Sequence, residues 1–158
     1  VPLLQAIFPD AYFVVQLRNP YATCVKEAED DFYEWRRTLD LSKKVSLFAE
    51  HWANTYAYAL NDLEDWDRKV TLRYEDLVQD PEQTLSQVAC AIDLDYHPDM
   101  VPRAHHQFPL GSSEQHKWHP VKPNVNDKHL RRLSVQQAAL IQRRVGDVAS
   151  SFNYHPPS

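Results

Sequence analysis

A short apolar segment that ends in an arginine and runs directly into a helix start constrains this chain most. Residues 12–17 (Tyr-Phe-Val-Val-Gln-Leu) are rich in β-branched and aromatic side chains, and only Gln16 interrupts the apolar run. That composition is typical of a parallel strand buried on both faces. Asn19 and Pro20 follow Arg18, and they are favoured at the N-cap and the first position of a helix. The segment therefore predicts a strand–turn–helix unit of an α/β fold.

The same junction is a candidate anion site. Arg18 lies beside the predicted helix N-terminus, where backbone N–H groups without intrahelical partners attract negative charge. A guanidinium and a helix N-terminus together suit a phosphate group. The junction alone leaves a second interpretation open, in which Arg18 is an ordinary surface arginine at a strand–helix turn.

Composition excludes several classes of site. The 158 residues include only two glycines, Gly111 and Gly146, so neither the G-x-G-x-x-G nor the G-x-x-x-x-G-K phosphate loop exists here. The net charge of −5 disfavours nucleic-acid binding. Cys24 and Cys90 form no disulfide framework and fit free thiols, which predicts a cytoplasmic location. No apolar run reaches the roughly 18 residues that a membrane span needs.

The rest of the chain alternates between predicted helices and one further strand. We expect helices over residues 2–8, 20–37, 42–65 and 81–92, a strand over 69–74 and a helical turn at 75–77. A final helix follows Ser134 and extends to Phe152. Asp80-Pro81-Glu82-Gln83 and Ser134-Val135-Gln136-Gln137 fit the capping-box pattern. Residues 95–128 lack periodicity and are expected to be irregular, as long functional loops often are.

In this order, the motifs resemble the sulfotransferases that use 3′-phosphoadenosine 5′-phosphosulfate. The resemblance implies a helix-rich α/β, P-loop-like three-layer fold with a parallel sheet. Only two strands are predicted, so we expect residues 1–158 to form a single partial domain, the C-terminal part, without the N-terminal strands and the phosphosulfate loop. The matching segments are Phe8-Pro9-Asp10-Ala11, Arg18-Asn19-Pro20, Leu72-Arg73-Tyr74-Glu75-Asp76-Leu77, Asp80-Pro81-Glu82 and Phe152-Asn153-Tyr154.

The resemblance also implies cofactor-binding residues. It places the 3′-phosphate of the donor on Arg18 and the adenine near Tyr74. Relatives commonly have a serine eight residues after that arginine, where this chain has Lys26. Lys26 either replaces the hydroxyl as a point charge or extends to solvent. Lys117, within Ser112–Trp118, matches a basic residue of a loop over the donor, and a solvated lysine is the alternative.

No catalytic residue of this chain follows from the resemblance. In relatives the phosphosulfate loop and the catalytic base precede the Arg-Asn-Pro strand, and the 17 residues before Arg18 contain no matching motif. Glu75 and Asp76 are expected to act as structural caps. We therefore expect no transferase activity from this chain alone.

The implied reaction is transfer of a sulfuryl group from 3′-phosphoadenosine 5′-phosphosulfate to a hydroxyl or amine of a small-molecule or carbohydrate acceptor, without a metal. Two alternatives stay open: a non-catalytic interaction module that retains the sulfotransferase fold, and another P-loop-like nucleotide-dependent transferase. A zinc site is disfavoured, because the spacing of the candidate histidines fits no common zinc pattern. These histidines are His105, His106, His116 and His119.

Overall fold

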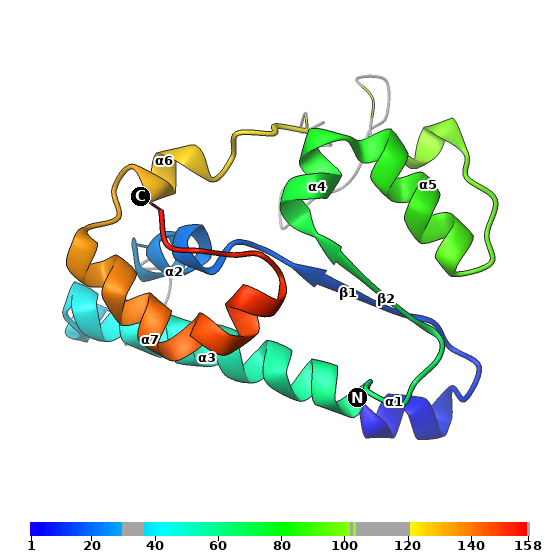
Figure 1. Cartoon of the computed structure of the whole chain (residues 1–158), viewed down its shortest axis with the longest axis horizontal. Helices are drawn as coiled ribbons and strands as arrows, with labels where there is room; N and C mark the ends of the chain where they lie inside the picture. Colours follow the sequence, from blue (N-terminus) through cyan, green and yellow to red (C-terminus); the bar gives the residue numbers. More distant parts are fainter. Residues whose placement is uncertain (30–36, 102, 104–120, 158) are drawn as a thin grey trace.

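The computed structural model describes residues 1–29, 37–101, 103 and 121–157 (Figure 1). Helices dominate this part of the chain, and a pair of strands joins them. The elements are, in order, α1 (Pro2–Ile7), β1 (Phe13–Leu17), α2 (Pro20–Glu29), α3 (Leu41–Asp62), β2 (Lys69–Arg73), α4 (Tyr74–Gln79), α5 (Pro81–Ala91), the 3-10 turn η2 (Pro98–Met100), α6 (Asp127–Leu130) and α7 (Val135–Ser151).

The two strands pair in parallel, as the sequence predicts, with Phe13 opposite Lys69 and Leu17 opposite Arg73. The chain passes from β1 to β2 through α2 and α3. Both arrowheads in Figure 1 point away from α1, so the two strands end at the same edge of the sheet. The residues that follow them, Arg18 and Tyr74, therefore lie side by side.

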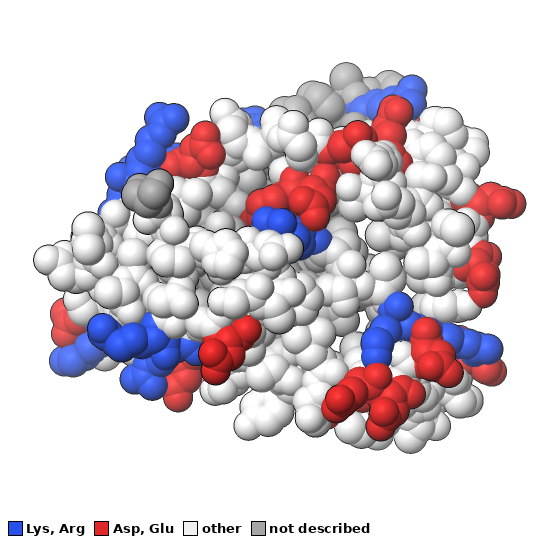
Figure 2. Space-filling model, viewed as in Figure 1, with Lys and Arg blue, Asp and Glu red and all other residues white. Residues whose placement is uncertain are grey.

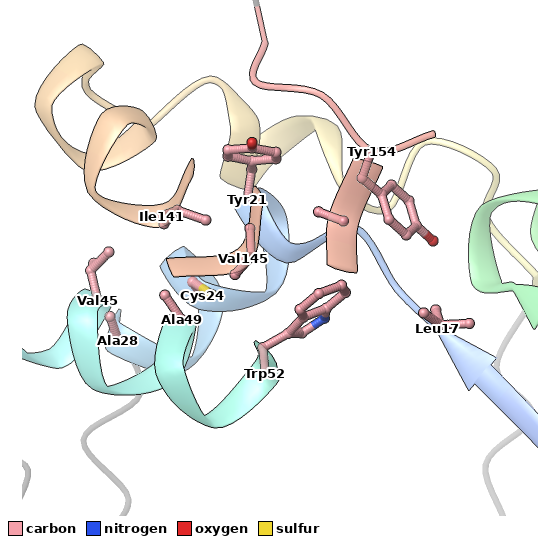
Figure 3. Packing of buried hydrophobic residues seen from close by; sticks show 11 residues of the cluster. Leu17, Tyr21, Cys24, Ala28, Val45, Ala49, Trp52, Ile141, Val145 and Tyr154 are labelled. Atoms are coloured by element: carbon pink, nitrogen blue, oxygen red, sulfur yellow. The ribbon is translucent and has the colours of Figure 1, made fainter. Parts of the chain in front are cut away.

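The hydrophobic core lies where α2, α3 and α7 meet beside the end of β1 (Figure 3). Its side chains come from all three helices, from the last residue of β1 and from the residues that follow α7. On the other side of the sheet, α4 and α5 pack against β2. The buried cluster consists of Leu17, Tyr21, Cys24, Ala28, Val45, Ala49, Trp52, Ile141, Val145, Ala149 and Tyr154.

Helix capping follows the sequence patterns. The Ser134 hydroxyl accepts from the Gln137 N–H at 3.2 Å, and the Gln137 side chain accepts from the Ser134 N–H at 2.9 Å. These two bonds confirm the predicted capping box at the start of α7. The Asp80 carboxylate accepts from the Gln83 N–H at 3.0 Å, which confirms Asp80 as the N-cap of α5.

The expectation that the first strand is buried on both faces is wrong. Val14 is 48% exposed and Gln16 is also exposed, whereas Leu17 is fully buried. The core formed by α2, α3 and α7 packs against Val15 and Leu17, whereas α4 and α5 pack against β2. Among the described residues, this apolar run therefore takes part in parallel pairing while the face of β1 that carries Val14 and Gln16 stays exposed.

Several boundaries also differ from the predictions. The long helix α3 ends at Asp62 rather than Asp65, and α4 extends from Tyr74 to Gln79 where a shorter turn was expected. The predicted irregular segment has helical turns at its two ends, η2 and α6, and residues 104–120 within it lie outside the described residues. Residues 30–36 of the predicted 20–37 helix also lie outside them.

Across the described ranges, none of the helices combines the length and apolar content of a bilayer span.

Candidate functional site

Aromatic side chains of α3 hold the end of β1. The Trp52 indole N–H donates to the Arg18 carbonyl at 3.0 Å, and the Tyr56 hydroxyl donates to the Gln16 carbonyl at 3.0 Å. These two carbonyls belong to alternate residues, so both donors bond the same edge of the strand. The position of Arg18 is therefore set by the core helix α3 as well as by pairing with β2.

The start of α2 is neutralised by a carboxylate of the chain itself. The Asn19 N–H donates to Glu75 Oε1 at 2.9 Å, and Asn19 Oδ1 accepts from the Ala22 N–H at 3.1 Å. Pro20 has no N–H to offer. The expectation of unpaired N–H groups at this helix start is therefore wrong for Asn19 and Ala22. Glu75 supplies the negative charge that a helix N-terminus favours.

The Arg18 guanidinium is held on two sides. Its Nε and Nη2 donate to Asn126 Oδ1 at 2.9 and 2.8 Å. Its carbon Cζ lies 4.8 Å from the centre of the Tyr74 ring, within the range of a cation–π contact. The structure thus brings two of the sequence-predicted site residues, Arg18 and Tyr74, into direct contact at the carboxyl ends of the two strands.

A buried chain of hydrogen bonds continues from Asn126. Its Nδ2 donates to Glu75 Oε1 at 2.6 Å, and the Tyr154 hydroxyl donates to Glu75 Oε2 at 2.6 Å. Asn126 is 7% exposed and Tyr154 is 1% exposed. We call Arg18, Tyr74, Glu75, Asn126 and Tyr154 the Arg18 cluster. Acidic and basic side chains meet near the start of α4, where this cluster lies (Figure 2).

Tyr154 is fixed from three directions. Burial, followed by the hydrogen bond to Glu75, raises the pKa of its hydroxyl, so that this group stays protonated and donates. Arg73 Cζ lies 4.6 Å from the centre of the Tyr154 ring, and the Trp52 ring centre lies 6.4 Å away with the two rings nearly perpendicular. The residue therefore links the end of α7 to the core and to the Arg18 cluster.

Two other predicted site residues are not part of the cluster. Lys26 lies on α2, and its ammonium pairs with Glu27 Oε1 at 2.7 Å. The Lys26 side chain is 43% exposed, and its role toward a phosphate stays a prediction. Lys117 lies outside the described residues, as do the four histidines considered for zinc. The described ranges hold no group of three or more His, Cys, Asp or Glu side chains arranged for a metal ion.

His129 is buried next to the cluster. Its Nδ1 lies 3.9 Å from Glu29 Oε2, and this nitrogen has no hydrogen-bond partner among the described residues. Burial lowers the pKa of His129, as do the positive charges of Lys128, Arg18 and Lys26, while Glu29 raises it. The neutral imidazole is therefore the form that the folded chain favours.

This burial predicts a pH dependence of stability. The folded-state pKa lies below the ordinary value of 6.5, so the unfolded chain binds the proton more readily and stability falls as pH drops through that value. We expect His129→Gln to reduce the loss of unfolding free energy between about pH 7.5 and about pH 5.5, measured by urea denaturation. His51→Gln, at an exposed position of α3, is the control. An equal loss in wild type and His129→Gln would contradict this role of the imidazole.

A separate cavity of about 400 Å³ lies between β2, α5 and the last turn of α7. Its lining includes Arg73 and Asp76 but none of Arg18, Lys26 and Tyr74. This cavity is therefore distinct from the candidate site.

Fold and cluster together define an α/β domain with a fixed cation at the carboxyl ends of two parallel strands. The sequence model of the sulfotransferase family matches residues 1–98. The chain therefore belongs to the sulfotransferase family. None of the curated proteins matches it.

Two solved structures share the fold. The chain is similar to the sulfotransferase domain from the curacin biosynthetic pathway, with 19% identity, a TM-score of 0.65, and coverage of 97% of this chain and 57% of that domain. It is also similar to the sulfotransferase domain from the Synechococcus PCC 7002 olefin synthase, with 23% identity, a TM-score of 0.67, and coverage of 93% and 50%. The chain thus spans about half the length of these domains.

Sequence reasoning missed Asn126 and Tyr154. Asn126 lies near the end of the segment expected to be irregular, where no periodicity marks a buried residue. Tyr154 was noted only as part of the closing Phe152-Asn153-Tyr154 match. The burial of Tyr154, which would require a hydrogen-bond partner for its hydroxyl, is visible only in the folded structure.

Proposed function

We propose that the chain provides the 3′-phosphate site of a sulfotransferase whose donor is 3′-phosphoadenosine 5′-phosphosulfate. The acceptor is a hydroxyl or amine of a small molecule or carbohydrate. The observation that carries this proposal is the pair of Arg18 and Tyr74, which lie 4.8 Å apart at the carboxyl ends of adjacent parallel strands. Ligands of open α/β sheets bind at this end of the strands.

The chemistry of Arg18 suits a phosphate. A guanidinium has five N–H donors, and Asn126 receives two of them. The edge between the two terminal nitrogens matches two phosphate oxygens. Arg18 is partly exposed, so a ligand in solvent can reach it. Because Glu75 already neutralises the helix start, the positive charge for the phosphate comes from the arginine and not from α2.

In this proposal Arg18 anchors the nucleotide and makes no bond to the transferred group. The sulfur forms a bond to the acceptor oxygen or nitrogen while its bond to the bridging oxygen breaks in line. The bridging oxygen leaves with the nucleotide, and a general base takes the acceptor proton. The Tyr74 ring, beside Arg18, offers an apolar surface to the adenine. Holding the nucleotide at its 3′-phosphate restricts its motion, which lowers the entropic barrier to transfer. Lys26 would add a second cation if its ammonium left Glu27.

Calorimetry with two nucleotides tests this proposal on the full-length protein. 3′,5′-Bisphosphoadenosine carries the 3′-phosphate and 5′-AMP lacks it. We expect the bisphosphate to bind at least about tenfold more tightly, the difference that one charge-assisted hydrogen bond makes. Equal affinities would contradict a 3′-phosphate site. Tight binding without transfer to any acceptor would instead favour a non-catalytic module with the same fold.

A further inference from the structure

Asn126 separates two opposite charges in the Arg18 cluster. Its Oδ1 accepts from Arg18 Nε and Nη2, and its Nδ2 donates to Glu75 Oε1 at 2.6 Å. The guanidinium can only donate and the carboxylate can only accept, so both partners require the same orientation of the amide. Asn126 is 7% exposed, so both bonds are largely shielded from solvent.

The Glu75 carboxylate accepts hydrogen bonds from three donors other than Arg18. Its Oε1 accepts from the Asn19 N–H at 2.9 Å as well as from Asn126, and its Oε2 accepts from the Tyr154 hydroxyl at 2.6 Å. Three donors therefore stabilise the carboxylate without a direct ion pair to Arg18. A carboxylate bonded directly to a guanidinium forms a strong bidentate pair that competes with any phosphate.

From this arrangement we propose that Asn126 is a positioning residue that determines nucleotide specificity. The neutral amide orients the guanidinium and keeps its positive charge available to a 3′-phosphate. This inference rests on the proposed 3′-phosphate site and adds the residue that determines the strength of that site. A negative side chain at position 126 would occupy the same two donors and offset the charge of Arg18.

Asn126→Asp tests the proposal, because it changes the charge with almost no change in shape. We expect this variant to lose at least about tenfold in affinity for 3′,5′-bisphosphoadenosine, measured by calorimetry on the full-length protein, with affinity for 5′-AMP changed by less than about twofold. The ratio of the two affinities is the readout, since a general loss of structure would lower both. Asn124→Asp, an exposed position two residues earlier, is the control and should leave the ratio unchanged.

Asn126→Asp places a carboxylate beside Glu75, and the repulsion between them can impair folding. A second variant therefore removes this repulsion. The double variant Asn126→Asp with Glu75→Gln removes that repulsion and leaves the introduced carboxylate facing Arg18. We expect its affinity ratio to fall as in the single variant. A wild-type protein that discriminates between the nucleotides, with a ratio preserved in these variants, would overturn the role of Asn126 alone. A wild-type protein that does not discriminate would overturn the proposed phosphate site itself.

Discussion

Arg18→Ala should weaken the binding of 3′,5′-bisphosphoadenosine by about 10- to 100-fold, because a charge-assisted hydrogen bond contributes about 1.5–3 kcal/mol. Trp52 holds the Arg18 backbone in place, and Asn126 holds the guanidinium. Its removal also leaves Asn126 Oδ1 without its donor, so the cluster loses order as well as charge. Calorimetry on the full-length protein, with 5′-AMP as the comparison ligand, measures the effect.

Two further variants show whether this loss of affinity depends on the donor geometry of Arg18 and on the position of its charge. Arg18→Lys keeps the charge but not the forked donor geometry, so its affinity should lie between wild type and Arg18→Ala. Arg68→Ala removes the same charge from a side chain that is 44% exposed and paired with Asp10. It should leave nucleotide affinity within about twofold of wild type, as an exposed ion pair contributes little. An Arg18→Ala protein that binds as tightly as wild type would refute the anchoring role.

Trp52→Ala should lower the free energy of unfolding by about 3–5 kcal/mol, the usual cost of removing a buried aromatic side chain. Trp52 is 5% exposed and lies in the core cluster, where its ring is nearly perpendicular to that of Tyr154 and its N–H donates to the Arg18 carbonyl. A typical domain has only about 5–15 kcal/mol of stability in total. The substitution therefore removes a large share of it, which urea denaturation detects as a lower midpoint.

The same helix offers a matched control. Tyr58 is also an aromatic residue of α3, but it is 69% exposed, and Tyr58→Ala should change stability by about 0.5 kcal/mol or less. Trp52→Phe keeps most of the buried ring and loses the bond to the Arg18 carbonyl, so we expect a loss of about 1 kcal/mol. If the Trp52→Ala protein were as stable as the Tyr58→Ala protein, the placement of Trp52 in the buried core would be contradicted.

Local patterns predicted most of the secondary structure. The strand before Arg18, the helix start at Asn19-Pro20 and the capping box at Ser134 are each encoded by residues within a few positions of one another, and the structure contains all three. Parallel pairing was predicted from the apolar composition of residues 12–17, and the order strand–helix–helix–strand is compatible with it. Since parallel strands end at one edge, the contact between Arg18 and Tyr74 is a consequence of that order.

The polar part of the cluster could not be predicted in the same way. Asn126 lies 108 residues from Arg18, and Tyr154 lies 79 residues from Glu75. Neither position belongs to a periodic pattern, and each side chain gains its role only when the residues just before α6 and just after α7 pack beside Arg18 and Glu75. The exposure of Val14 is a similar case, because only the tertiary arrangement determines which strand faces the helices cover.

The negative charge at the start of α2 is another feature that local sequence patterns could not fully predict. Asn19-Pro20 correctly marked a helix N-terminus, and its unpaired N–H groups suggested a site for an external phosphate. The structure instead places the Glu75 carboxylate there, with the Asn19 N–H as one of its donors. The local rule that a helix start attracts negative charge held, while the identity of the charge depended on a residue 56 positions away.

A crystal structure of the full-length protein with 3′,5′-bisphosphoadenosine tests the proposed site most directly. We expect the 3′-phosphate within hydrogen-bond distance of the terminal nitrogens of Arg18, the adenine against Tyr74, and Asn126 still between Arg18 and Glu75. A nucleotide bound with its 3′-phosphate away from Arg18, while Arg18 keeps only its contacts to Asn126 and Tyr74, would contradict the assignment.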